Sequence, residues 1–222
     1  MNRTVCAAFV LAACLSTSLA AAQGAPTVEL SPADPARWDL AFHVGWLGEN
    51  KSEIAPDWNE WYDAASFGAS AGYYWTPHLK LDVELGTTTK GGIFVQDYGI
   101  FSPGLPYVQS REHTFRTTSL AGGVTYQFFE NQRFHPFVGG GLAVVHERER
   151  TMLSFSGPRP PGVPPPVPET FDETSVSARP FAVVGFKAYT SERVFFRSDI
   201  LATGSTQHVE SVSWRAGIGF DF

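Results

Sequence analysis

The chain ends in residues 211–222, which have the sequence SVSWRAGIGFDF. Side chains alternate between the two faces of a β-strand, and here every second residue is apolar: Val212, Trp214, Ala216, Ile218, Phe220 and Phe222. The residues between them are Ser, Arg, Gly or Asp. This alternation predicts a strand with one face against lipid and the other toward a wet interior. We therefore expect the rest of the chain to supply further strands of the same kind.

The composition agrees with a protein built from strands and tight turns. The 222 residues are 43% hydrophobic and 14% aromatic, and they include 21 glycines. After the N-terminal region, no stretch approaches the ~20 apolar residues that a membrane-spanning helix needs. The formal net charge of -6 argues against a broad basic surface for nucleic acid. Strands that are half polar are compatible with this moderate hydrophobicity.

Residues 1–22 have the pattern of an export signal. Arg3 gives a positive start, an apolar run follows, and small residues precede a predicted cleavage after Ala22. Both cysteines lie in this segment, so the mature chain would hold no disulfide. A second interpretation takes Leu11 to Cys14 as a lipobox, with a lipid on Cys14. Residues 23–36 hold three prolines and predict a periplasmic lead-in.

Period-2 alternation recurs along the rest of the chain and predicts seven strands before the last one, at about residues 38–47, 62–75, 79–86, 112–128, 134–148, 179–189 and 193–201. For the strand at 134–148, the sequence does not decide which side chains face lipid, because apolar residues occur at both odd and even positions. Short turns are expected at 76–78, 129–133 and 190–192, and longer loops at 48–61, 91–110, 149–178 and 202–210. This arrangement predicts an all-β fold, an eight-stranded antiparallel up-and-down transmembrane β-barrel formed by residues 37–222.

The longest predicted loop, residues 150–177, is rich in proline. Seven of the eleven residues from Pro158 to Pro168 are proline. Proline cannot donate to a sheet ladder, so this segment is excluded from a sheet interior. A stiff, extended spacer is the favoured interpretation, and a ligand for a proline-binding domain is the alternative.

Three motifs resemble the small eight-stranded outer-membrane barrels, the superfamily of the OmpA transmembrane domain, OmpW and OmpX. They are the terminal pattern Trp214-x-Ala216-x-Ile218-x-Phe220-x-Phe222, the stretch HPFVGGG at 135–141, and RVFFRSD at 193–199. The resemblance implies a protein of the outer membrane of a Gram-negative bacterium, with outer-membrane lipid as its surroundings. It also implies that the barrel assembly machinery reads Trp214, Ile218, Phe220 and Phe222. The proline-rich loop is no general feature of these proteins.

The inward faces of the predicted strands carry charges of both signs. Eight strands enclose a lumen that side chains can just fill, and a buried charge is costly unless it is paired. We therefore expect lumen ion pairs among Lys80, Asp82, Glu84, Arg197, Asp199, Arg215 and Asp221. Aromatic residues gather at the short-turn end, where an interfacial girdle is expected: Trp75, Tyr126, Phe128, Phe134, Phe220 and Phe222.

The residues with catalytic potential do not form a convincing site. His208, Glu210 and Ser211 lie near the last strand, but neighbouring residues on a strand point to opposite faces. His146, Glu147 and Glu149 lack the spacing of metal ligands. We therefore predict no enzyme activity and no catalytic, cofactor-binding or metal-binding residue. Trp58, Trp61 and Tyr62 form either a ligand-binding patch or, more simply, anchors at the membrane interface.

The favoured function is a non-enzymatic integral outer-membrane protein with an envelope structural or surface-recognition role. Its outer loops would contact an unidentified surface ligand. The alternative is an OmpW-like narrow barrel that binds or passes a small hydrophobic molecule. A lipid-modifying hydrolase at the rim and a soluble lipocalin-like binder are less favoured. The terminal Phe220 and Phe222 argue against the soluble barrel.

Overall fold

The computed structural model describes residues 37–51, 61–101, 104–129, 133–158, 164, 167–205 and 208–222. The chain divides into two units, Met1–Pro35 and Ala36–Phe222, and the fold described below belongs to the second. The predicted export signal, its cleavage after Ala22, the alternative at Cys14 and the lead-in at 23–36 lie outside the described residues. Trp58 also lies outside them.

The described residues form nine β-strands, and all of their pairings are antiparallel. The strands are β1 (Trp38–Asn50), β2 (Trp61–Tyr74), β3 (Leu79–Thr88), β4 (Gly91–Phe101), β5 (Leu105–Gln127), β6 (Phe134–Ser156), β7 (Glu169–Tyr189), β8 (Val194–Gly204) and β9 (Val209–Asp221). The described part of the chain contains no helix that could cross a membrane.

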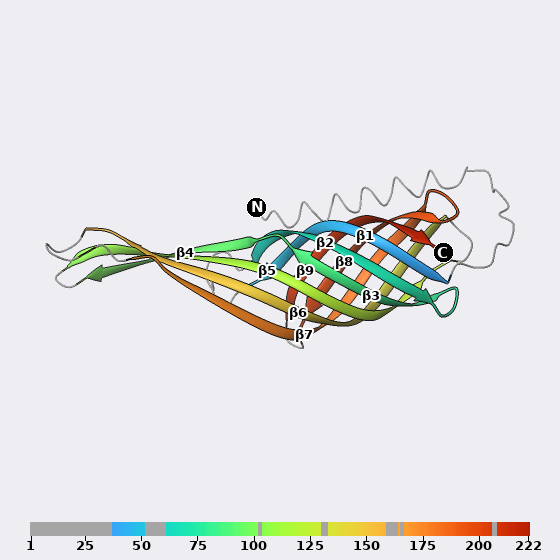
Figure 1. The fold of residues 1–222 in the computed structure, drawn as a ribbon, viewed down its shortest axis with the longest axis horizontal. Coiled ribbons are helices and arrows are strands. Elements are labelled where there is room, and N and C mark those ends of the chain that lie inside the picture. The colour runs from blue at the N-terminus through green and yellow to red at the C-terminus, as the bar shows by residue number, and fades with distance from the viewer. Residues whose placement is uncertain are drawn as a thin grey trace. The chain divides into compact units, whose positions relative to one another are not determined.

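Eight of these strands close a ring, as the sequence predicts. Each of them pairs with its neighbours in the chain, β1 pairs with β9, and β3 pairs with β5 across the position of β4. The closure between β1 and β9 is continuous from Asp39 opposite Asp221 to Glu49 opposite Ser211. Figure 1 shows this ring of tilted strands. Closure leaves no sheet edge along the ring, which is the condition for placing strands in lipid.

The alternation of side chains divides the ring into an exposed apolar exterior and a buried interior. On β1, Phe42, Val44 and Trp46 are exposed, whereas Ala41 and His43 are buried. On β6 the sequence leaves the facing open, and the structure turns Phe137, Ala143 and Val145 inward and Val138, Leu142 and Val144 outward. The exterior of the ring is therefore apolar over most of its strands.

The ring has a short-turn end and a long-loop end. At the short-turn end, Leu79 donates its backbone N–H to the Thr76 hydroxyl over 2.9 Å, and Trp38 and Phe222 exchange backbone hydrogen bonds. The residues predicted for an aromatic girdle are all exposed at this end: Trp75, Tyr126, Phe128, Phe134, Phe220 and Phe222. At the opposite, long-loop end, the connections comprise residues 51–60, 157–168 and 205–208, and the last of these is no longer than the turn at 75–78.

Two predicted loops are wrong, because strands continue through much of them. Residues 91–110 form β4 and the start of β5, which pair from Gly91 opposite Phe115 to Phe101 opposite Leu105. Within 150–177, β6 continues to Ser156 and β7 begins at Glu169. Glycine and proline in these segments weaken the strand pattern, but backbone pairing between neighbouring hairpins satisfies their N–H and C=O groups. Among the described residues of 150–177, those outside the strands are 157, 158, 164, 167 and 168.

The continued strands build a second region that we call the extension sheet. It comprises β4, residues 105–115 of β5, 146–156 of β6 and 169–176 of β7, all joined by antiparallel pairing. In Figure 1 these strands run on together beyond the ring at its long-loop end. The extension sheet has two free edges within the described chain, since β4 pairs only with β5 and β7 pairs with β8 only from Phe181 onward.

Candidate functional site

The lumen at the short-turn end is filled by a cluster of charged and phenolic side chains. Asp39 Oδ2 lies 2.9 Å from Lys80 Nζ and also contacts Lys187 Nζ, and both lysines are only 1% exposed. Lys80 is 2.7 Å from Asp82, and Lys187 donates to the Tyr74 hydroxyl over 2.7 Å. We call this group the lower layer. It brings the predicted Lys80 and Asp82 together, and it adds Asp39 and Lys187, which sequence reasoning missed.

Asp221 takes a different partner from the one expected. Its carboxylate accepts a hydrogen bond from the Tyr189 hydroxyl, and it has no ion pair with a described residue. Tyr189 lies on β7 and Asp221 on β9, so this hydrogen bond passes inside the lumen in front of β8, the strand between them. The inward-facing parity of Asp39 and Lys187 was a signal for their role, but sequence alone does not say which inward charges meet.

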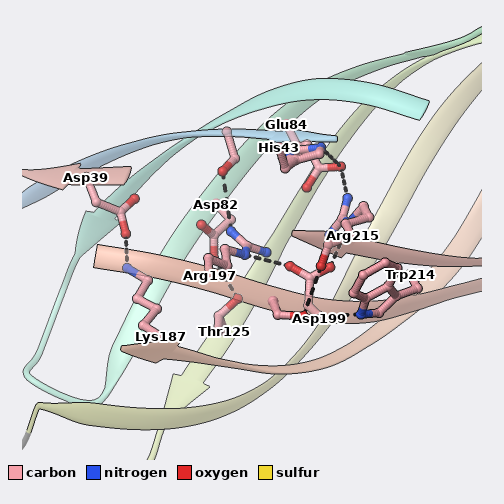
Figure 2. Close-up of polar contacts among 12 residues, drawn as sticks. Asp39, His43, Asp82, Glu84, Thr125, Lys187, Arg197, Asp199, Trp214 and Arg215 are labelled. Atoms are coloured by element: carbon pink, nitrogen blue, oxygen red, sulfur yellow. Dashed lines mark hydrogen bonds and ion pairs between the residues drawn. The ribbon is translucent and has the colours of Figure 1, made fainter. Parts of the chain in front are cut away.

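A middle layer crosses the lumen next. Asp199 lies between two arginines, with its carboxylate oxygens 2.6 Å from Arg197 Nε and 2.6 Å from Arg215 Nε (Figure 2). Arg215 also donates to Glu84 on β3, and His43 Nε2 lies 3.7 Å from the same carboxylate. The structure thus brings together four of the residues expected in the lumen. The network spans from β8 and β9 to β3, so it blocks the lumen with hydrogen-bonded charges.

An upper layer closes the lumen at the long-loop end. Glu49 accepts from Tyr62 over 2.7 Å and from Arg179 over 2.9 Å, and Arg179 is 2.7 Å from Glu210. Lys51 completes the layer with contacts to Glu49 at 3.3 Å and to Glu147 at 2.6 Å. Sequence reasoning could not group these residues, because they come from β1, β2, β6, β7 and β9 and, for Lys51, from the position after β1.

The small clusters with catalytic or metal-binding potential are separated by these contacts. Glu210 pairs with Arg179, whereas the Ser211 hydroxyl lies 2.7 Å from the Thr203 hydroxyl. On β6, His146 is exposed on the outer face and Glu147 is buried on the inner face. Neither group converges on a common point.

Two cavities lined by described residues lie between the layers. The larger has a volume of about 80 Å³, and apolar lining residues such as Leu47, Val145 and Leu201 lie among polar ones that include Glu84 and Arg215. The smaller has about 20 Å³ and lies beside Asp82 and Arg197. Pockets for drug-sized ligands occupy roughly 300–1,000 Å³. These cavities are large enough for a few water molecules.

Three residues of the predicted assembly signal lie on the exterior of β9, and Phe222 follows directly after the strand. Trp214, Ile218, Phe220 and Phe222 are all exposed, and they alternate with the buried Ser213, Arg215 and Asp221. Trp214 Nε1 donates to the Ser198 hydroxyl of β8 over 3.2 Å. Four apolar side chains therefore stand together on one outward face beside the closing seam of the ring.

The extension sheet exposes large apolar side chains away from the ring. On β4, Phe94, Tyr98 and Ile100 project from one face and are 61%, 79% and 73% exposed. Gln96 lies between Phe94 and Tyr98 on the same face, and Asp97 on the opposite face is bound by Arg111 of β5. The free edge of β4 adds backbone N–H and C=O groups that a partner strand could use.

Comparisons with known proteins agree with the ring. The model of the outer membrane protein beta-barrel domain matches residues 7–222. The crystal structure of Neisserial surface protein A superimposes with a TM-score of 0.53 at 15% identity, covering 83% of this chain and 97% of that protein. No curated protein matches the sequence significantly.

Two further solved structures show lower similarity. The attachment invasion locus protein Ail of Yersinia pestis has a TM-score of 0.48 at 12% identity, over 84% of this chain and 99% of that one. The N-terminal barrel of OprF from Pseudomonas aeruginosa has a TM-score of 0.44 at 17% identity, over 82% and 97%. The family match covers nearly the whole sequence, and the ring of strands is the fold of Neisserial surface protein A. The chain therefore belongs to the outer membrane protein beta-barrel domain family and is an outer-membrane protein.

Proposed function

We propose that this protein is a non-enzymatic outer-membrane barrel that recognises a protein ligand at the cell surface through its extension sheet. The observation that carries the proposal is the row of Phe94, Tyr98 and Ile100 on a free edge strand. Exposed apolar edge strands promote unwanted association, and natural proteins usually shield them. A partner that adds a strand along β4 would bury this row and satisfy the edge.

The filled lumen supports a function outside the barrel. Three layers of paired charges cross it, and the larger cavity holds about 80 Å³. An OmpW-like barrel that binds or passes a small hydrophobic molecule needs more open space than this. A lipocalin-like binder needs an apolar interior, whereas here the charges lie inside and the apolar residues outside.

The proposal includes a route to the membrane and an orientation. Residues 1–22 would direct export and be removed after Ala22, and the barrel assembly machinery would read Trp214, Ile218, Phe220 and Phe222. The short-turn end would then face the periplasm and the extension sheet the outside of the cell. A Tyr98→Cys variant should react with a membrane-impermeant maleimide in intact cells, and Glu192→Cys in a short turn should react only after the outer membrane is opened.

Adhesion tests the recognition role. Cells of a non-adherent host that express the protein should bind surfaces coated with fibronectin, laminin or collagen. The triple variant Phe94→Ser, Tyr98→Ser, Ile100→Ser should lose that binding. Gln96→Ser is the matched control, because Gln96 is exposed on the same face of β4. Equal adhesion by wild type and triple variant, or no adhesion above the host alone, would refute the proposal.

A further inference from the structure

A group of arginines stands on the exterior of the ring where β5 and β6 enter the extension sheet. Arg116 and Arg148 are directly opposite each other in the β5–β6 pairing, and Arg150 follows on the same face of β6. All three are exposed, with 62% of the Arg148 side chain and 57% of the Arg150 side chain accessible. We call these three residues the arginine cluster.

The charge of the cluster is only partly balanced within the protein. Asp172 of β7 lies 3.1 Å from Arg150 Nε and 3.7 Å from Arg148 Nη2. Arg116 has no ion pair with any described residue. Glu112 is exposed on the same face of β5. It lies opposite Met152, in the next outward pair after that of Thr114 and Arg150. Like charges directly opposite on neighbouring strands destabilise a sheet, so the facing arginines favour an external anion.

The cluster lies at the height of the second membrane boundary. On the same two strands, Tyr126 of the aromatic girdle lies opposite Val138. Ten residues separate Tyr126 from Arg116 and Val138 from Arg148, and a strand crosses a bilayer in about 9–11 residues. On the membrane side, the next outward pair is Thr118 opposite His146, and the pair after it, Leu120 opposite Val144, is apolar and exposed. The arginines are thus separated from the aromatic girdle by about the length of strand that spans the bilayer.

We propose that the arginine cluster binds phosphate groups of lipid headgroups in the outer leaflet. Guanidinium groups pair with phosphate through parallel, charge-assisted hydrogen bonds, and basic residues at the edge of an apolar belt favour anionic headgroups. Arg116 and Arg148 would hold the phosphate, and Asp172 would orient Arg150 and Arg148 beside it. The site is separate from the apolar row on β4, so it stands independently of the recognition role.

Native mass spectrometry of the detergent-solubilised mature chain tests this site. The probes are bis-phosphorylated lipid A, the same lipid without its phosphates, and free pyrophosphate. The wild type should retain the phosphorylated lipid, and Arg116→Gln with Arg148→Gln should lower its affinity about tenfold or more, since each lost contact is a charge-assisted hydrogen bond. The dephosphorylated lipid should bind both proteins equally weakly.

A matched control removes the same charge at the other end of the barrel. Arg133 and Arg193 are exposed beside the short turns, so Arg133→Gln with Arg193→Gln should leave lipid retention unchanged. Heat-modifiable migration on a gel reports whether each variant is folded. Retention that is equal in wild type and cluster variant overturns the proposal. Equal losses in the control variant, or displacement of the lipid by equimolar pyrophosphate, also overturn it, because the first indicates non-specific charge and the second a free-phosphate site.

Discussion

Replacing Asp39 by Asn should destabilise the barrel far more than the loss of an exposed ion pair would. Asp39 is 2% exposed and is the carboxylate in ion-pair distance of both Lys80 and Lys187. Lys80 keeps Asp82 at 2.7 Å, whereas Lys187 keeps the neutral Tyr74 hydroxyl and the Phe195 ring, whose centroid is 4.1 Å from its Nζ, with no other carboxylate of the described residues in ion-pair distance. The change therefore leaves one ammonium group buried without a counter-ion.

The size of the effect follows from that buried charge. Removing one partner of a buried ion pair costs about 3–5 kcal/mol, and every 1.4 kcal/mol is a factor of ten in the folding equilibrium. The exposed pair of Asp97 and Arg111, with 49% and 40% of their side chains accessible, provides the comparison. Asp97→Asn should cost about 0–1 kcal/mol.

The assay is reversible urea unfolding of the mature chain in lipid vesicles, followed by tryptophan fluorescence and heat-modifiable migration. Lys187→Met in the Asp39→Asn background removes the stranded charge, so the double variant should recover part of the lost stability. The reasoning fails if Asp39→Asn and Asp97→Asn cost the same. It also fails if Lys187→Met adds its own full cost to that of Asp39→Asn, since the two residues would then not be coupled.

Four further variants have expected outcomes. Arg197→Ala with Arg215→Ala removes both guanidiniums of the middle layer and should raise ion conductance in planar bilayers above the wild-type level; unchanged conductance would mean that other groups close the lumen. A Cβ on Gly217 would lie 2.0 Å from the Phe42 carbonyl oxygen, whereas one on Gly122 meets nothing within 4 Å. Gly217→Ala should therefore cost about 1–3 kcal/mol in vesicle unfolding, and Gly122→Ala should be stabilising by about 0.4–1 kcal/mol. Deletion of Phe222 should reduce the amount of protein that sediments with the outer membrane on a sucrose gradient; undiminished sedimentation would remove this residue from the assembly signal.

The ring could be predicted from sequence because its constraint is local. Lipid outside and charge inside impose a period of two on every crossing strand, and residues 79–86 of β3 and 211–221 of β9 follow it. Strand β6 does not, because residues 137–145 are apolar or glycine at both parities, and only its pairing with β5 and β7 fixes which face turns inward.

The extension sheet was missed for a related reason. Beyond the membrane neither face must be apolar, so residues 91–110 carry no strict alternation and their glycines and prolines indicate a loop. Residues 91–101 pair with residues 105–115 of the same hairpin, and residues 108–110 also pair with a strand distant in sequence, as Gln109 does with Phe155. For the lumen, the sequence predicts that inward charges form ion pairs, but it does not say which residues pair, because the partners are distant in sequence. Asp39 and Lys187 are 148 residues apart, and only the closed ring brings them into contact.

The division between the lumen and the extension sheet bears on where function resides. The layers inside the ring join β1, β3, β7, β8 and β9 through ion pairs that cost several kcal/mol to break, so they hold the ring in one arrangement and leave little freedom for transport. The extension sheet has the opposite character, since within the described chain its two edges are unpaired and its apolar residues on β4 are exposed. In the proposed recognition role, a rigid ring that presents such a sheet limits the loss of conformational entropy on binding, because the strands of the sheet are ordered before a partner arrives. Interfering with the ring should therefore impair recognition only through folding, whereas changes on β4 should impair recognition in a barrel that is still folded.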